Sequence, residues 1–257
     1  MPHTEGMTGE RLDGGNVGGA VRIGDTVRRA TGPWTPAVHA LLNHLAAKGF
    51  QGAPRVLGID EEGREILSYL DGETVGSRKP WPAWVHAEAT LDQVAHWLRG
   101  FHEAVADFVP PPGSVWRALR PAPGWVVGHN DAAPYNAAWR DGRLVGFFDW
   151  DFAGPVAPGW DLAFTAFSWT PLHARHVVTA EGFTDFPGRE RRLRRFLDAY
   201  GWSGNLADFR DLVRDRLQAQ LDGLRRVAAA GDPVFVRLLE EGGGDLARAI
   251  VELPALG

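Results

Sequence analysis

Four polar residues lie close together in the sequence, and their types and spacing could support chemistry. His129, Asp131 and Asn136 share one short segment, and Asp149 follows after an apolar stretch. Transfer of a phosphoryl group needs a carboxylate that orients the attacking hydroxyl and accepts its proton, together with oxygen ligands for Mg²⁺ on the phosphates. Asp131 can be that carboxylate, and Asn136 and Asp149 carry the oxygen atoms that Mg²⁺ favours. The spacing therefore predicts Mg-dependent phosphoryl transfer to a hydroxyl.

The surroundings of these residues make the pattern more specific. The spacing is the His-x-Asp-x4-Asn arrangement of kinases, in which the Asp is the base and the Asn holds metal. A short apolar strand precedes the segment, and an Asp141-Gly142 turn between two strand-like runs returns the chain to Asp149. Asp151 fits either a second metal ligand or a polar contact on the same loop, and we expect the polar contact.

Two kinds of segment must position this chemistry. Residues 1–72 are predicted to form a small antiparallel sheet with one inserted helix, because short strand-like runs alternate with turn residues. Pro36 can occupy the first turn of that helix, and Gly49 ends its apolar repeat. Residues 73–257 are predicted to be mostly helical. We therefore expect an α+β protein with a small N-terminal lobe, a larger C-terminal lobe and the active site in the cleft between them.

The predicted large lobe has two irregular features. Five prolines fall within residues 110–123, which predicts an extended loop. Near the end of the chain, two short helices are expected, one over Phe235 to Glu241 and one over Leu246 to Leu253.

Composition excludes several other classes of protein. A chain of 257 residues with 44% hydrophobic content can bury a sizeable core. A net charge of -5, without a basic excess, argues against a nucleic-acid partner. The sequence has no cysteine, which excludes disulfides and thiolate metal sites and suits a cytoplasmic protein. No export signal or apolar run of about 18 residues is present, so we expect no membrane association.

Three motifs resemble the aminoglycoside phosphotransferase family, which has the protein-kinase-like fold: His129 to Asn136 (HNDAAPYN), Phe148 to Phe152 (FDWDF) and Trp160 to Ala163 (WDLA). The resemblance covers most of the chain. It implies that Asp131 is the catalytic base, that Asn136 and Asp149 are metal ligands, and that His129 and Asp161 brace the catalytic loop. It also implies ATP or GTP as the donor and an aminoglycoside or another small metabolite as the acceptor, without naming that acceptor.

The resemblance also implies nucleotide contacts in the small lobe. A glycine-rich turn would fold over the phosphates, because glycine lets backbone N–H groups approach them closely. Its expected contacts are Gly14, Gly15, Asn16 and Val17. The strand after it should carry a basic residue for the α- and β-phosphates; Arg28 and Arg29 are available, and we favour Arg28. Ser68 and Leu70 lie where the hinge to adenine is expected.

The first helix lacks the acid that should hold this arginine. Kinases have a glutamate there, whereas this sequence has Val38 and His39. Another acid could take over, the arginine could be held differently, or the nucleotide could bind less tightly. Because the expected lysine is also missing from the strand after the glycine-rich turn, the alternative function is a catalytically silent nucleotide-binding or scaffold protein. The retention of Asp131, Asn136 and Asp149 argues against it.

Overall fold

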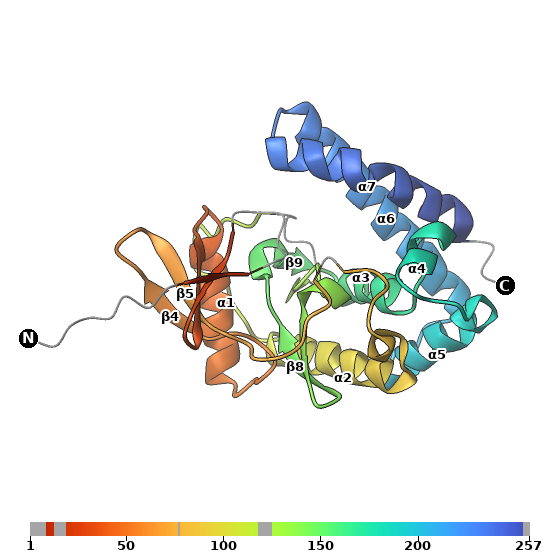
Figure 1. The fold of residues 1–257 in the computed structure, drawn as a ribbon, viewed down its shortest axis with the longest axis horizontal. Coiled ribbons are helices and arrows are strands. Elements are labelled where there is room, and N and C mark those ends of the chain that lie inside the picture. Colours follow the sequence, from red (N-terminus) through yellow and green to blue (C-terminus); the bar gives the residue numbers. More distant parts are fainter. Residues whose placement is uncertain (1–8, 13–18, 77, 118–124, 254–257) are drawn as a thin grey trace, which may run out of the picture.

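The computed structural model describes residues 9–12, 19–76, 78–117 and 125–253. A small sheet-containing lobe lies beside a larger helical part (Figure 1). This arrangement confirms the predicted α+β class with a small antiparallel lobe. The predicted boundary near residue 72 falls in the connection after the last strand of the sheet and remains a prediction. Gly14, Gly15, Asn16 and Val17 lie outside the described residues.

The small lobe is built on a five-stranded antiparallel sheet with strand order β1-β2-β3-β5-β4. Its strands are β1 (Glu10–Arg11), β2 (Val21–Ile23), β3 (Thr26–Ala30), β4 (Val56–Ile59) and β5 (Arg64–Ser68). Helix α1 (Thr35–Ala47) has proline in its first turn, as predicted, and its apolar repeat packs into the core with Leu67 of β5. The sheet face that carries Leu67 is therefore the buried one.

Two two-stranded antiparallel sheets and a set of helices form the larger part. The strands pair as β6 (Val126–Gly128) with β9 (Gly154–Val156), and as β7 (Ala137–Arg140) with β8 (Arg143–Phe147). The helices are α2 (Glu88–Ala104), α3 (Pro158–Trp169), α4 (Arg175–Ala180), α5 (Arg189–Tyr200), α6 (Leu206–Ala229) and α7 (Pro233–Glu252). Asp141 and Gly142 both have positive φ in the β7–β8 turn, which the two-residue Asp-Gly turn was predicted to require.

Helix α7 corrects the prediction of two short helices near the end of the chain. It runs unbroken through Gly242, Gly243 and Gly244. Gly243 is buried, and a Cβ there would lie 2.7 Å from Leu239 and 3.9 Å from Leu221 of α6. Leu239 belongs to α7 itself and 3.9 Å is an ordinary contact distance, so Gly243 packs against α6 in the usual way. This tertiary packing outweighs the low helix propensity of the glycines.

The two parts of the molecule share one core and meet at Gly52. Its carbonyl oxygen accepts hydrogen bonds from Phe147 N (3.1 Å) and from Trp97 Nε1 (3.0 Å). A Cβ on Gly146 would lie 2.5 Å from the same oxygen, so only glycine fits there. This contact fixes the small lobe against α2 and β8.

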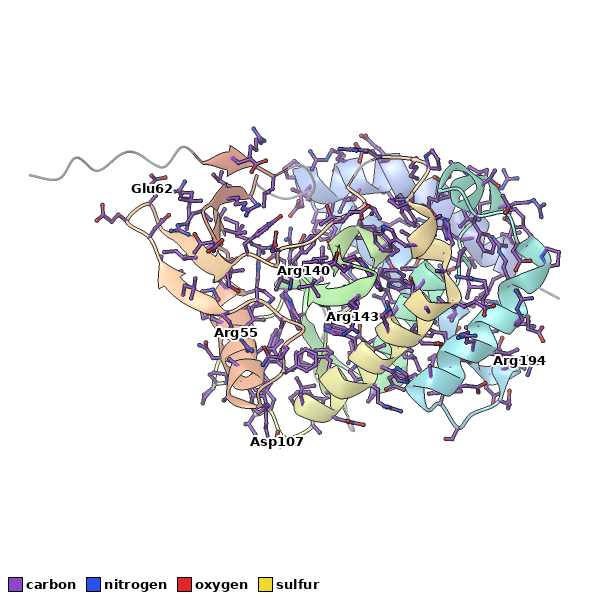
Figure 2. All side chains as sticks on the ribbon, turned by 60° about the horizontal axis from the view of Figure 1, so that its bottom comes forward. Arg55, Glu62, Asp107, Arg140, Arg143 and Arg194 are labelled. Atoms are coloured by element: carbon purple, nitrogen blue, oxygen red, sulfur yellow. The ribbon has the colours of Figure 1, made fainter. Side chains whose placement is uncertain are left out.

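Charged side chains cover the outside of the molecule. Glu62, in the β4–β5 turn, and Arg194, on α5, lie toward opposite ends of it (Figure 2). Among the described residues, none of the helices has the length and apolar character needed to cross a membrane.

Candidate active site

Asp131 lies in the loop after β6, and both of its carboxylate oxygens are hydrogen-bonded. The Tyr135 hydroxyl donates to Oδ1 (2.8 Å) and Asn136 Nδ2 donates to Oδ2 (2.8 Å). Burial and the nearby charge of Asp149 raise the pKa of Asp131 to about 7, although both hydrogen bonds act in the opposite direction. A carboxylate with such a pKa can accept a proton near neutral pH, which suits a general base.

Asp161, in the first turn of α3, holds the backbone of this loop through hydrogen bonds. Its fully buried carboxylate accepts hydrogen bonds from the backbone N–H groups of His129 (2.9 Å) and Asn130 (2.7 Å), and from His102 Nε2 (3.1 Å). Burial alone would raise the pKa of Asp161, but these hydrogen bonds and the two imidazoles lower it overall. Asn130 has a φ of 64°, so Asp161 holds a left-handed turn just before Asp131.

His129 connects the catalytic loop to the loop that carries Asp149. Its Nδ1 accepts from Asp131 N (3.3 Å), and its Nε2 lies 3.2 Å from the carbonyl oxygen of Phe148. Burial lowers the pKa of His129, so the ring is neutral and Nε2 donates to that carbonyl. His129 and Asp161 thus hold the backbone that leads into Asp131, as the predicted bracing role requires.

A backbone hydrogen bond brings Asn136 next to the loop that begins with Asp149. Phe148 N donates to the Asn136 carbonyl oxygen (2.9 Å), and Asp149 itself has a φ of 59°. Because the Asn136 amide nitrogen is bound to Asp131, its oxygen is the atom left for a cation. One carboxylate and one amide oxygen suit Mg²⁺, which takes most of its other ligands from phosphate and water. The described residues include no cluster of three or more His, Asp or Glu side chains arranged for a metal.

Arg29, rather than Arg28, contacts Asp149 and Asp151. Its Nη1 lies 3.0 Å from Asp149 Oδ1, and its Nη2 contacts Asp151. Arg28 instead donates to Thr26 Oγ1 (2.5 Å), and its Nε lies 3.8 Å from Asp60. Successive residues of a strand point to opposite faces of the sheet, so only one of the two arginines can reach the cleft.

Glu65 of β5 supplies the acid that α1 lacks. The strand register sets Arg29 directly opposite Glu65, and Arg29 Nε lies 2.6 Å from Glu65 Oε1. The second oxygen of this buried carboxylate lies 2.7 Å from His39 Nε2. Helix α1 therefore contacts the acid through His39. Sequence reasoning missed Glu65, although it shares its strand face with the core residue Leu67, and a charge on an apolar face is a usable signal.

Arg117 is a second cation at this site that sequence reasoning missed. Its Nη1 lies 3.3 Å from Asp151, and its guanidinium lies over the rings of Trp34 (4.5 Å) and Phe152 (5.0 Å). Burial lowers the pKa of Arg117. The proline-rich stretch was expected only as a loop, and nothing in its composition marks this arginine. Asp151 thus contacts two arginines, as expected for a polar contact on the loop.

The predicted hinge residues lie at the end of β5. Ser68 N donates to the Arg55 carbonyl oxygen (2.9 Å), and the Ser68 hydroxyl oxygen accepts from Arg55 N (2.8 Å). These two bonds tie the end of β5 to the residue before β4. Leu70, two residues after Ser68, is half-buried. The adenine contacts expected from Ser68 and Leu70 remain predictions.

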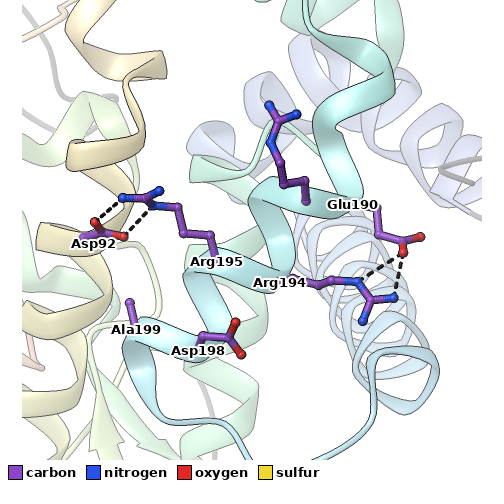
Figure 3. A pocket seen from close by; sticks show the side chains of 7 residues that line it. Asp92, Glu190, Arg194, Arg195, Asp198 and Ala199 are labelled. Atoms are coloured by element: carbon purple, nitrogen blue, oxygen red, sulfur yellow. Dashed lines mark hydrogen bonds and ion pairs between the residues drawn. The ribbon is translucent and has the colours of Figure 1, made fainter.

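A separate surface hollow of about 560 Å³ lies between α2 and α5 (Figure 3). Four of its charged side chains form two ion pairs with one another. Arg195 binds both oxygens of Asp92 (2.8 and 2.7 Å), and Arg194 binds Glu190 (2.7 Å). This hollow has no contact with Asp131 or Arg29, and its balanced charges give it no preference for an anion.

Comparison with known proteins agrees with this geometry. Residues 113–200 match the sequence profile of the phosphotransferase enzyme family. The chain is also 38% identical, over 204 residues, to the trifolitoxin immunity protein of Rhizobium leguminosarum bv. trifolii, an alignment that covers 75% of this chain and 74% of that protein. The chain belongs to the phosphotransferase enzyme family. This finding confirms the resemblance seen in its motifs.

Solved structures share the fold of this phosphotransferase-family chain. Amicoumacin kinase in complex with AMP-PNP, Ca²⁺ and Ami has a TM-score of 0.63 at 11% identity, covering 98% of this chain and 90% of that one. Macrolide 2′-phosphotransferase from Brachybacterium faecium has a TM-score of 0.57 at 16% identity (97% and 92% covered). The GDP and kanamycin complex of an aminoglycoside phosphotransferase has a TM-score of 0.57 at 15% identity (97% and 92% covered). At these identities the likeness shows the fold.

Proposed function

We propose that this phosphotransferase-family chain is a small-molecule kinase that transfers the γ-phosphoryl group of ATP or GTP to a hydroxyl in a Mg²⁺-dependent reaction. The observation that carries the proposal is the convergence of Asp131, Asn136 and Asp149 from one loop and hairpin, opposite Arg29 of the small lobe. The ATP analogue and the GDP bound to structures of the same fold support a nucleoside triphosphate donor.

In the proposed reaction, the acceptor oxygen forms a bond to the γ-phosphorus while the bond to the β–γ bridging oxygen breaks. Asp131 orients the acceptor hydroxyl and takes its proton. Asn136 and Asp149 would hold Mg²⁺, which supplies charge neutralisation on the phosphates when bound. Arg29 lies beside Asp149, where its planar guanidinium can bind phosphate oxygens in a bidentate manner.

The acceptor is proposed to be a toxic small molecule with a free hydroxyl, aminoglycoside-like or of another class. Structures of the same fold include an amicoumacin kinase, a macrolide phosphotransferase and an aminoglycoside phosphotransferase in complex with kanamycin. A relative at 38% identity is named for immunity to trifolitoxin. Phosphorylation adds negative charge and bulk to such a molecule, which would weaken its binding to a target. A cytoplasmic enzyme is proposed, since that is where nucleoside triphosphates are available.

The alternative of a silent nucleotide-binding protein loses its main support. It rested on the missing glutamate of the first helix, and Glu65 pairs with Arg29 in its place (2.6 Å). A cation with an acid partner is therefore present beside Asp149, although the acid comes from a strand.

The test is to incubate the purified protein with Mg-ATP or Mg-GTP and a panel of aminoglycosides, macrolides, amino alcohols and sugars. A mass gain of one phosphoryl group on an acceptor is the expected result. Asp131→Asn should lower turnover by about 10²- to 10⁴-fold, the usual contribution of a general base. Its nucleotide affinity should change little, because the base acts on the acceptor. Absence of both transfer and metal-dependent nucleotide binding would reject the proposal.

A further inference from the structure

Tyr135 lies beside the proposed base but is open to solvent. It belongs to a short turn, Pro134–Asn136, whose first and last residues are buried, while Tyr135 itself is 44% exposed. Its hydroxyl nevertheless turns back to Asp131 Oδ1 at 2.8 Å. The side chain of Tyr135 is thus partly exposed to solvent while its hydroxyl contacts the proposed base.

The two oxygens of Asp131 differ in how they can be reached. Oδ2 is bound by the side chain of Asn136, which is only 5% exposed and also donates to the Asp131 carbonyl oxygen (2.9 Å). Oδ1 is bound by the exposed Tyr135. An incoming hydroxyl can therefore approach Oδ1 by moving a surface side chain, whereas approach to Oδ2 would disturb the buried loop.

The Tyr135 hydroxyl already donates to Asp131 Oδ1 at 2.8 Å. It therefore competes with any other hydroxyl, including that of water, for the same oxygen. A water molecule is the smallest such competitor and brings no other contacts with the protein.

We infer that Tyr135 guards the base: it occupies the acceptor-facing oxygen of Asp131 until an acceptor displaces it, and so suppresses hydrolysis of the bound nucleotide. The inference rests on the proposed function. In the suppressed reaction, a water oxygen bonds to the γ-phosphorus, the bond to the β–γ bridging oxygen breaks, the nucleoside diphosphate leaves, and the water proton passes to Asp131. An acceptor differs from water because binding energy from the rest of the molecule can drive the displacement of Tyr135.

The inference is tested with Tyr135→Phe, which keeps the ring and removes the hydroxyl. Release of nucleoside diphosphate from Mg-ATP and Mg-GTP is measured without any acceptor, alongside nucleotide affinity. The expected result is a rise in hydrolysis of about 10-fold, the scale of one hydrogen bond to a charged group, with affinity changed less than about 2-fold. The double variant Asp131→Asn/Tyr135→Phe should lose the gain, because the water still needs the base.

Tyr69→Phe is the matched control, since the ring of Tyr69 packs under the Arg22 guanidinium (3.9 Å) in the small lobe. It should hydrolyse nucleotide at the wild-type rate. If Tyr135→Phe binds Mg-nucleotide normally but hydrolyses it no faster than wild type, the guarding role is rejected and the proposed kinase activity stands. If the wild-type protein binds no Mg-nucleotide and neither protein turns it over, the proposed function itself fails.

Discussion

The catalytic loop and the arginine opposite it are held in different ways. In the large lobe, the partners of Asp131 are Tyr135 and Asn136, which lie a few positions further along the same loop. In the small lobe, Arg29 is held by Glu65, which only strand pairing brings opposite it. The side-chain partners of Asp131 are therefore local in sequence, although Asp161 braces the loop from α3, whereas the partner of Arg29 depends on the register of a sheet.

This difference shows that Arg29 takes its acid partner from a strand rather than from the first helix, where the family resemblance led us to expect it. The usual glutamate on the first helix is replaced by a strand glutamate, and α1 keeps a link to the pair through His39 (2.7 Å). Arginine suits this pair because its guanidinium carries five N–H donors in a planar fork. One Arg29 side chain accordingly contacts Glu65, Asp149 and Asp151.

The largest effect in either region is expected from Asp161→Asn in the large lobe. The variant keeps the shape of the side chain, but an amide cannot accept all three of the hydrogen bonds that Asp161 receives from His129, Asn130 and His102. Buried donors left without an acceptor cost about 1–3 kcal/mol each. The free energy of unfolding, measured with denaturant, should fall by about 3 kcal/mol, and turnover should fall at least about 100-fold as the loop loosens.

The same variant gives a pH test of the bracing. The folded-state pKa of Asp161 lies below its ordinary value of 3.8. Its stabilisation is therefore fully present above that ordinary value and is lost as the pH falls through the folded-state pKa. The stability difference between wild type and Asp161→Asn should stay constant near neutral pH and shrink in strong acid. A difference that grows on acidification would contradict an ionised Asp161.

In the small lobe, the variants Arg29→Ala and Arg28→Ala test which arginine of β3 contacts the nucleotide. Hydrogen bonds to charged groups contribute about 1.5–3 kcal/mol, so Arg29→Ala should weaken Mg-nucleotide binding by about 10- to 100-fold. Arg28→Ala should change it less than about 2-fold, because Arg28 lies on the other face of β3. Calorimetry on both proteins decides the matter. Equal losses would show that the sheet face does not determine the phosphate contact, and Arg29→Lys should retain part of the affinity.

The sequence was most informative where structure is local. The segment from His129 to Asn136, the Asp141-Gly142 turn and the return to Asp149 could all be located, because short-range spacing determines them. Choosing between Arg28 and Arg29 required the register of β3 against β5, to which residues far apart in the chain contribute. The same dependence hid Glu65.

Two further features also depended on tertiary structure. Arg117 was missed because its position depends on the rings of Trp34 and Phe152, which come from other segments of the chain. The continuity of α7 depended on its packing against α6, which the local signal of three glycines could not reveal.

The smallest expected effect, and the most specific test of the pair with Arg29, comes from Glu65→Gln. The amide keeps the shape and can still hydrogen-bond to Arg29 and His39, but the buried negative charge is gone. Arg29 would then be neutralised only by Asp149 and Asp151, so it competes more strongly with Mg²⁺ for Asp149. A net change of about 0.5–1.5 kcal/mol predicts a 3- to 10-fold loss of Mg-nucleotide affinity and a higher Mg²⁺ requirement.

Glu62→Gln is the control for this variant, because Glu62 lies in the neighbouring turn with a side chain that is 70% exposed and pairs with Arg64 (3.1 Å). Exposed pairs contribute little, so its nucleotide affinity and Mg²⁺ requirement should match wild type. If Glu65→Gln behaves like Glu62→Gln, Arg29 needs no acid in the small lobe, and Asp149 and Asp151 alone position it. In that case the two regions would depend on the same loop, and the contrast between them would disappear.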